Sequence, residues 1–258
     1  MRMSRGWRTA TTAAMLSMTP VLVAAVGPPA RSDASTTPVS MVAFGDSVPS
    51  GARCSCRPFP RRYANAVGAH IGRTVDMSNE AFGGATTYNV LRQLDNATVR
   101  AVVRRSRTAL VMIGANDFGP AFQRVLAHKA LGRKAFPPVA ARVQRNVVTI
   151  IRRLRAIRPG IRIVVADYWN VMKDGKVGLR DYGAWGESKA DQATGYANAA
   201  LRRAVATTRA IYVSTYTAFK GQRGNVDPTP LLAPDGDHPD SRGHEVIARV
   251  FYRAAPNG

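Results

Sequence analysis

Short apolar runs alternate along the chain with longer segments in which apolar residues recur every three or four positions. Five runs have the length and composition of buried strands: residues 39–44, 75–82, 109–113, 161–166 and 210–214. Six segments have helical spacing: residues 61–71, 87–94, 99–105, 140–157, 191–208 and 241–254. This alternation predicts an α/β sandwich with a mostly parallel sheet covered on both faces.

The N-terminus has the layout of a secretory signal peptide. Arg2, Arg5 and Arg8 precede an apolar stretch, and a segment rich in Pro, Ser and Thr follows it. Pro20 interrupts the apolar stretch, so a cleaved signal is favoured over a membrane anchor. We expect residues 1–34 to be a Sec-type signal peptide, with cleavage after residue 34 or near residue 26. Residues 35–258 are then a single domain that is secreted or associated with the cell envelope.

Composition narrows the class of protein. With 258 residues, 45% hydrophobic and 21% charged, the chain is neither mainly disordered, collagen-like nor a polytopic membrane protein. Its 37 Lys and Arg residues outnumber 16 Asp and Glu residues, which gives a net charge of +21. This charge predicts weak association with anionic envelope or membrane surfaces. Since zinc-finger spacing, RNA-binding aromatic motifs and long basic blocks are missing from the sequence, specific nucleic-acid binding is not expected. We expect a monomer.

The only two cysteines, Cys54 and Cys56, are separated by one residue. Export to an oxidising compartment favours a disulfide between them over free thiols. A loop this small gains little chain entropy from a disulfide, and it can be strained. Two thiols alone do not complete a metal coordination shell, so a metal site is not expected.

Three residues with possible chemical roles follow predicted strands, at the edge where parallel sheets bind ligands. They are Ser47, Gly84 and Asn116. Serine chemistry needs a hydroxyl nucleophile, a base and donors for the oxyanion. Ser47 supplies the hydroxyl. The candidate donors are the backbone N–H groups of Ser47 and Gly84 and the side-chain amide of Asn116. His238 lies in a loop before the last helix, where Asp235, three residues earlier, can fold back and fix the ring tautomer.

Neighbouring residues are given other interpretations. Asp46 and Asp117 are expected to bond backbone groups around the turns after the strands. Asp237 is expected to point away from the His238 ring, and His244 to lie on the surface of the last helix. The segment 118–138 contains several phenylalanines, and it could be a substrate-contacting flap or a short surface helix. Substrate contact is the favoured interpretation, because the segment follows Asn116 directly.

Taken together, four segments resemble the four blocks of the SGNH (GDSL-type) hydrolases: residues 45–47, 83–87, 114–117 and 235–239, with the sequences GDS, GGATT, GAND and DGDHP. The overall arrangement is most similar to exported actinobacterial members. The resemblance implies a flavodoxin-like, three-layer α/β/α fold with a five-stranded sheet. It also implies ester hydrolysis without a metal or cofactor, with Ser47 as nucleophile, His238 as base, Asp235 as its orienter, and Ser47, Gly84 and Asn116 forming the oxyanion hole. Val48 stands where many members carry Leu or Tyr, which leaves substrate preference open.

The sequence therefore predicts a secreted serine esterase acting on a small-molecule, lipid or glycan ester through an acyl-enzyme. A short or medium acyl group is expected, because the chain has no long apolar segment beyond residues 118–138. Three alternatives stay open. They are a deacetylase or acyltransferase acting on envelope polysaccharide, a phospholipid-directed lipase held at interfaces by the basic charge, and a non-catalytic wall-binding protein. The presence of Ser47, Asn116 and His238 argues against the last.

Overall fold

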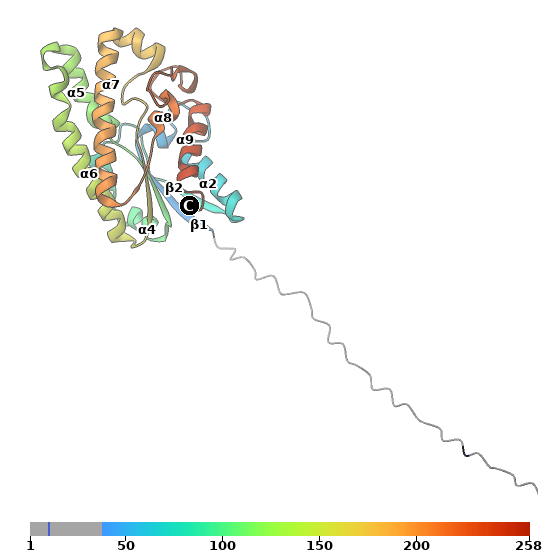
Figure 1. Cartoon of the computed structure of the whole chain (residues 1–258). Helices are drawn as coiled ribbons and strands as arrows, with labels where there is room; N and C mark the ends of the chain where they lie inside the picture. Colours follow the sequence, from blue (N-terminus) through green and yellow to red (C-terminus); the bar gives the residue numbers. More distant parts are fainter. Residues whose placement is uncertain (1–9, 11–37) are drawn as a thin grey trace, which may run out of the picture. The chain divides into compact units, whose positions relative to one another are not determined.

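A five-stranded parallel sheet forms the centre of the molecule in the computed structural model, which describes residue 10 and residues 38–258 (Figure 1). Its strands are β1 (Val39–Gly45), β2 (Val75–Asn79), β3 (Thr108–Met112), β4 (Arg162–Ala166) and β5 (Ile211–Val213). The spatial order is β2-β1-β3-β4-β5, and each neighbouring pair is parallel. This is the flavodoxin-like order, so the predicted fold class is confirmed. The predicted signal peptide falls almost entirely on residues outside the described part.

Burial explains why the central strands lack polar alternation. All five residues of β3 are buried, and it pairs with β1 on one side and β4 on the other. A parallel strand covered on both faces needs an apolar side chain at nearly every position. The continuous apolar runs of the sequence therefore mark the middle of the sheet, whereas β2 at the edge carries the exposed Asp76.

Helices cover both faces of this sheet, as Figure 1 shows, with α5, α6 and α7 on one side and α2 and α9 on the other. The helical segments are α1 (Ser47–Ser50), α2 (Phe59–Ile71), α3 (Thr87–Gln93), α4 (Ala97–Arg105), α5 (Ala115–Ala127), η1 (Lys129–Ala135), α6 (Pro137–Ile157), α7 (Gly175–Thr208), α8 (Thr215–Lys220), η2 (Thr229–Leu231) and α9 (Ser241–Ala254). Among the described residues, no helix is long and apolar enough to cross a membrane.

Two parts of the fold differ from the expectation. The segment 118–138 is not a flap, because it forms α5 and η1 and fully buries Phe118, Phe122 and Phe136. Phe118 and Phe122 are four residues apart, so they point to the same face of α5 and pack into the core. The helix expected at residues 191–208 also begins earlier, at Gly175, and is bent at Gly183, whose φ of +66° suits glycine.

Two helical glycines provide a test of how closely the segments pack. A Cβ at Gly195 on α7 would meet nothing within 4 Å, whereas at Gly243 on α9 it would lie 2.3 Å from the carbonyl oxygen of Leu231. We expect Gly195→Ala to raise the free energy of unfolding by about 0.5–1 kcal/mol through helix propensity. Gly243→Ala should lower it by about 1–3 kcal/mol through overpacking. Urea denaturation measures both, and a shift of the same sign in the two variants would contradict this packing.

Candidate active site

Ser47 is placed by a tight turn at the end of β1. A Cβ at Gly45 would lie 2.1 Å from the carbonyl oxygen of Met112 on β3, so glycine is required for the two strands to approach this closely. Asp46 then caps α1, and its Oδ1 accepts a hydrogen bond of 3.0 Å from the N–H of Val48. Ser47 is consequently the first residue of a short helix at the carboxyl edge of the sheet.

The Asp46 carboxyl joins this turn to the segment after β4. It is 1% exposed, and its second oxygen accepts a hydrogen bond from the hydroxyl of Tyr168. Burial raises the pKa of Asp46 to about 7, although the hydrogen bonds from Tyr168 and Val48 oppose the rise. The expected structural role of this carboxyl around the turn is confirmed.

Asn116 and the loop carrying Gly84 are tied together by hydrogen bonds. The side-chain amide of Asn116, in the first turn of α5, donates to the carbonyl of Ala85 over 2.9 Å. The buried carboxylate of Asp117 accepts from the N–H and the hydroxyl of Thr87, both at 2.8 Å. These bonds bring the start of α5 to the start of α3. The preceding Gly84 has a φ of +76°, in the region that favours glycine.

His238 is oriented by Asp235, as the spacing predicts. The ring Nδ1 lies 2.7 Å from Asp235 Oδ2, whereas the nearest oxygen of Asp237 is 4.0 Å away. Asp235 Oδ1 also accepts from the N–H groups of Asp237 and His238, at 3.0 and 3.1 Å. Burial disfavours the charged form of Asp235, but these hydrogen bonds together hold its pKa below the ordinary value. The carboxylate favours the tautomer with hydrogen on Nδ1, which leaves Nε2 able to accept a proton.

The three elements meet at a cavity of about 30 Å³. Ser47, Asn116 and His238 line it, together with four residues that follow β4: Tyr168, Trp169, Asn170 and Val171. Within residues 38–258, no hydrogen bond joins the Ser47 hydroxyl to the His238 ring, and such contacts often tighten only when substrate binds. Gly84 is connected to the cavity through Ala85 and Asn116 rather than lining it.

The residues after β4 line the cavity. The sequence allows the aromatic residues at this position to line a cleft or to belong to the core, and the core is the favoured interpretation. Tyr168 and Trp169 are buried, as expected of core aromatic residues, but they also form one wall of the cavity. The side-chain oxygen of Asn170 accepts from the N–H of Met172 and the hydroxyl of Thr194, at 3.1 and 2.8 Å. Their position at the end of a parallel strand, as for Ser47 and Asn116, is the signal that could have found them.

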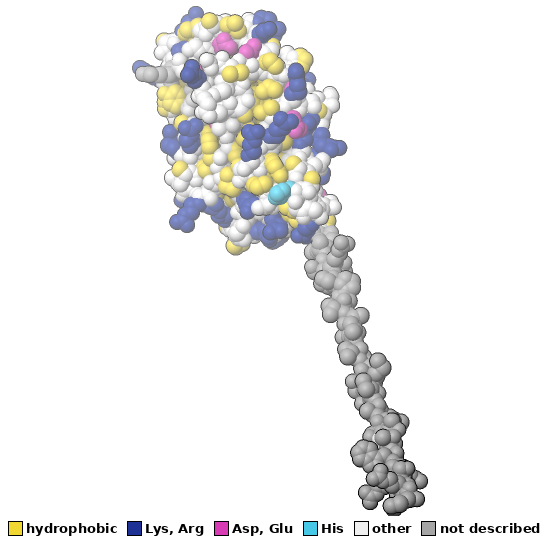
Figure 2. Space-filling model, turned by 45° about the vertical axis from the view of Figure 1, so that its right-hand side comes forward, with side chains coloured by type: hydrophobic (Ala, Val, Ile, Leu, Met, Phe, Trp, Pro, Cys, Tyr) yellow, Lys and Arg dark blue, Asp and Glu magenta, His cyan; other side chains and the backbone are white. Residues whose placement is uncertain are grey.

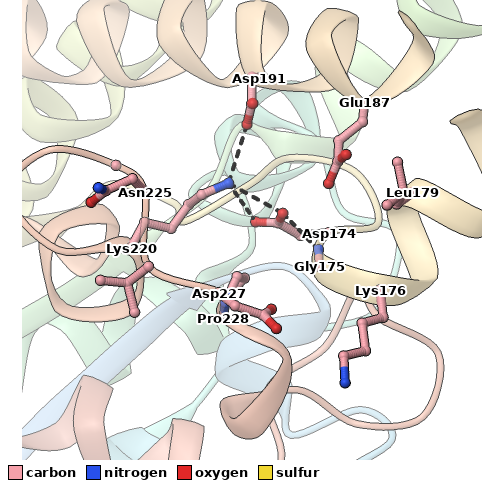
Figure 3. Close-up of a pocket in the computed structure, with 12 residues that line it drawn as sticks. Asp174, Gly175, Lys176, Leu179, Glu187, Asp191, Lys220, Asn225, Asp227 and Pro228 are labelled. Atoms are coloured by element: carbon pink, nitrogen blue, oxygen red, sulfur yellow. Dashed lines mark hydrogen bonds and ion pairs between the residues drawn. The ribbon is translucent and has the colours of Figure 1, made fainter. Parts of the chain in front are cut away.

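A buried ion pair supports the turn that carries His238 (Figure 3). Lys220 Nζ lies 3.0 and 3.1 Å from the two oxygens of Asp174 and 3.2 Å from Asp191. The Asp174 N–H donates to the carbonyl of Gly236 over 2.7 Å. Lys220 and Asp174 line a second cavity, of about 370 Å³, whose lining residues are different from those of the Ser47 cavity. Lys220 and Asp174 are 46 residues apart, and no local pattern in the sequence marks the pair.

His244 is buried, so the expected position on the helix surface is wrong. α9 packs its apolar face against α2, and His244 lies in that contact with its Nδ1 accepting a hydrogen bond of 3.2 Å from the N–H of Phe59. Burial lowers the pKa of His244 to about 4, which keeps the ring neutral. The sulfur atoms of Cys54 and Cys56 lie together nearby, with their Cα atoms 5.0 Å apart. That separation suits a disulfide, which stays a prediction.

Comparison with known proteins gives the family. The model of the GDSL-like lipase/acylhydrolase family matches residues 43–246, which hold all of the proposed catalytic residues. The chain therefore belongs to this family of carboxylic ester hydrolases. Among curated proteins, none matches the chain.

Several solved structures with the same fold are named as lipases or esterases. A lipase from a goat rumen metagenome has a TM-score of 0.70 at 19% identity, covering 84% of this chain and 97% of its own. A phospholipase A1 from Streptomyces albidoflavus has a TM-score of 0.62 at 20% identity, covering 85% and 100%. A variant of an acetyl-xylooligosaccharide esterase from Geobacillus has a TM-score of 0.59 at 16% identity, covering 84% and 93%. At these identities the likeness shows the fold alone.

The raised pKa of Asp46 predicts a pH-dependent stability. Between the ordinary value of 3.8 and about 7, the unfolded carboxyl is ionised while the folded one keeps its proton, so stability falls as pH rises through this window. In Asp46→Asn this pH dependence should vanish. The slope of the unfolding free energy against pH should then become less negative by up to about 1.4 kcal/mol per pH unit. The amide of the variant can still accept from Val48.

Urea denaturation at about pH 5, 6 and 8 compares the wild type with Asp46→Asn. Asp76→Asn is the matched control, because Asp76 is exposed on β2. Parallel stability curves for the wild type and Asp46→Asn would contradict the assignment.

Proposed function

We propose that this chain is a secreted serine esterase in which Ser47, His238 and Asp235 form the catalytic triad. The observation that carries the proposal is the common cavity of Ser47, Asn116 and His238, in which Asp235 already holds the histidine ring over 2.7 Å. A hydroxyl, an oriented base and an amide donor at one cavity are the groups that acyl transfer needs.

The mechanism follows from these positions. His238 Nε2 takes the proton of Ser47 as its Oγ attacks the ester carbonyl, while Asp235 stabilises the imidazolium that forms. The N–H of Ser47 and the Asn116 amide, both at the cavity, stabilise the oxyanion. The N–H of Gly84, on the loop that Asn116 ties to the cavity through Ala85, is proposed as the third donor. One hydrogen of the Asn116 amide is bonded to Ala85, which orients the group and leaves the other for substrate.

Collapse of the tetrahedral intermediate moves the proton from His238 to the leaving alcohol and leaves the acyl group on Ser47. Water, deprotonated by His238, then attacks this acyl-enzyme, and the acid leaves as Ser47 recovers its proton. Each proton transfer is assigned to one histidine, so the proposal requires no metal or cofactor.

The size of the cavity supports a short acyl group. Its volume of about 30 Å³ is a small multiple of what one water needs, and polar groups form much of its lining. Acetyl fits such a space better than a fatty-acyl chain. A carbohydrate deacetylase or acyltransferase is therefore the second candidate, which product analysis with a sugar acceptor distinguishes. A solved structure with this fold is named as an acetyl-xylooligosaccharide esterase.

The basic surface supports a location at an anionic envelope. Figure 2 shows Lys and Arg side chains scattered over the displayed face rather than gathered in one patch. A spread of this kind favours weak, salt-sensitive attraction rather than a specific interface. It is also what a phospholipid-directed lipase would use, and strong salt dependence on anionic vesicles but not on soluble esters would support that activity.

The export of the chain rests on its sequence. We propose that residues 1–34 direct Sec-type secretion, that residues 35–258 act as a single monomeric hydrolase domain, and that Cys54 and Cys56 pair after export. The four arginines and one aspartate of the leader would be lost, so the secreted protein would remain strongly basic.

Substitutions at the site test the assigned roles. Ser47→Ala should abolish hydrolysis of p-nitrophenyl acetate, because the nucleophile is lost. Asn116→Ala should lower kcat about 10²–10³-fold by removing one oxyanion donor. Ser188→Ala, at an exposed position of α7, should leave the rate unchanged. Wild-type activity in folded Ser47→Ala would refute the mechanism.

A panel of p-nitrophenyl esters from acetyl to palmitoyl tests the acyl group. We expect acetyl and butyryl esters to have the highest kcat/KM. Val171→Ala, which widens the cavity, should shift the butyryl-to-acetyl ratio about tenfold toward butyryl. Val226→Ala, at a valine that is 52% exposed, is the control. Faster turnover of palmitoyl than of acetyl ester in the wild type would contradict a short-chain site.

A further inference from the structure

Cys54, Cys56 and His244 form a cluster outside the catalytic cavity. The two sulfur atoms and a ring nitrogen of His244 lie within 4.8 Å of one another. Both cysteines are half-buried in the segment that follows α1, while His244 is fully buried on α9. The cluster thus joins the segment after the nucleophile to the helix after the catalytic turn.

The hydrogen bonds of His244 identify its tautomer. Nδ1 accepts from the N–H of Phe59 over 3.2 Å, so in the neutral ring the hydrogen is on Nε2. This Nε2 is buried and has no hydrogen-bond partner among the residues that the structure describes. A buried donor is normally paired, because leaving it unpaired carries a desolvation penalty. In the structure Nε2 is hydrogen-bonded to neither sulfur, although a ring nitrogen and both sulfur atoms lie within 4.8 Å of one another.

This tautomer also argues against a metal at the cluster. A histidine that binds a metal through one nitrogen normally donates the hydrogen on its other nitrogen to an acceptor. Here Nδ1 faces a backbone N–H, which is a donor. His244 is therefore not arranged to complete a ligand set, and among the described residues its Nε2–H is an unpaired buried donor close to the cysteine segment.

The backbone of the cysteine segment is strained. Arg53 and Ser55 have φ values of +62° and +46°, which residues with a Cβ rarely adopt. A disulfide across one intervening residue also gains little from chain entropy. A disulfide closing this segment would therefore gain little stability from the crosslink, and weakly stabilised or strained disulfides are the ones that exchange readily with thiols.

We propose that Cys54 and Cys56 are a thiol–disulfide exchange site in which His244 Nε2–H donates a hydrogen bond to the thiolate released on reduction. The thiolate of a small-molecule thiol attacks one sulfur, the bond between the cysteines breaks, and the other cysteine leaves as the thiolate that His244 holds. A second external thiol then attacks the mixed disulfide. Two external thiols are oxidised to one external disulfide, and the two electrons and two protons they give up reduce Cys54 and Cys56.

Equilibration of the folded protein with glutathione buffers tests this site, with the reduced fraction measured by alkylation and mass spectrometry. In His244→Asn the amide oxygen takes the place of Nδ1 and can accept the hydrogen bond from Phe59. The variant has no donor at the position of Nε2. We expect it to shift the equilibrium constant about tenfold toward the oxidised form. His244→Gln, which places an amide near Nε2, should restore the wild-type value to within about threefold. His70→Asn, at an exposed histidine on α2, is the control.

Three results would overturn the proposal. The first is wild-type protein that does not interconvert between its two states in glutathione, a test that needs no variant. The second is a folded His244→Asn variant with the wild-type equilibrium constant. The third is stoichiometric zinc retained by the reduced wild type after dialysis, because Nε2 would then be a ligand and not a donor. Circular dichroism checks that each variant is folded.

Discussion

Carboxyl groups that accept hydrogen bonds from neighbouring groups hold each of the proposed catalytic side chains in place. Asp46 caps the turn at Ser47, Asp117 binds the start of α3 beside Asn116, and Asp235 holds both the ring and the backbone of His238. A parallel sheet brings the ends of its strands to one edge, but it does not fix the loops that follow them. Without these carboxyl groups, the loops would have no shared anchor, and the cavity would lose its geometry.

Carboxyl groups also hold loops together beyond the cavity. Asp167, at the end of β4, accepts from the hydroxyls of Tyr212 and Ser214, at 2.6 and 2.9 Å, which fixes the segment after β5. Asp174, paired with Lys220, contacts the turn of His238 through a hydrogen bond from its N–H to the carbonyl of Gly236. In a chain with 16 acidic residues, several are therefore committed to loops at one edge of the sheet. Because these carboxyl groups are turned toward loops, they neutralise little of the basic surface, although the net charge itself follows from the composition.

Much of this arrangement could be predicted from the sequence, for identifiable reasons. The final helix occupies residues 241–254 as expected, because its apolar positions repeat with helical spacing. Its N-cap is Asp240 and not Ser241, the residue that the sequence suggests for this role. The family match supports the four motifs, whose order along the chain is what made them specific. The contact of Asp235 with His238 follows from a spacing of three residues in one turn.

Other features depend on contacts that no local pattern shows. A helix in the segment of α5 is only the less favoured interpretation of the sequence, because its start at Ala115 and Asn116 has the composition of a turn. That this helix is buried follows only from the packing of Phe118 and Phe122 in the core. Periodicity does not distinguish a buried histidine from an exposed one at the position of His244. The Tyr168 contact with Asp46 joins residues 122 positions apart, so it appears only once the sheet is assembled.

The most direct test of the central claim is to label the folded protein with a fluorophosphonate, which reacts only with a serine activated as a nucleophile, and to locate the adduct by peptide mass spectrometry. The account predicts one adduct per chain, on Ser47, that forms in the wild type and is lost in His238→Ala. An adduct on a different serine, or folded wild-type protein that stays unlabelled while hydrolysing esters, would contradict it.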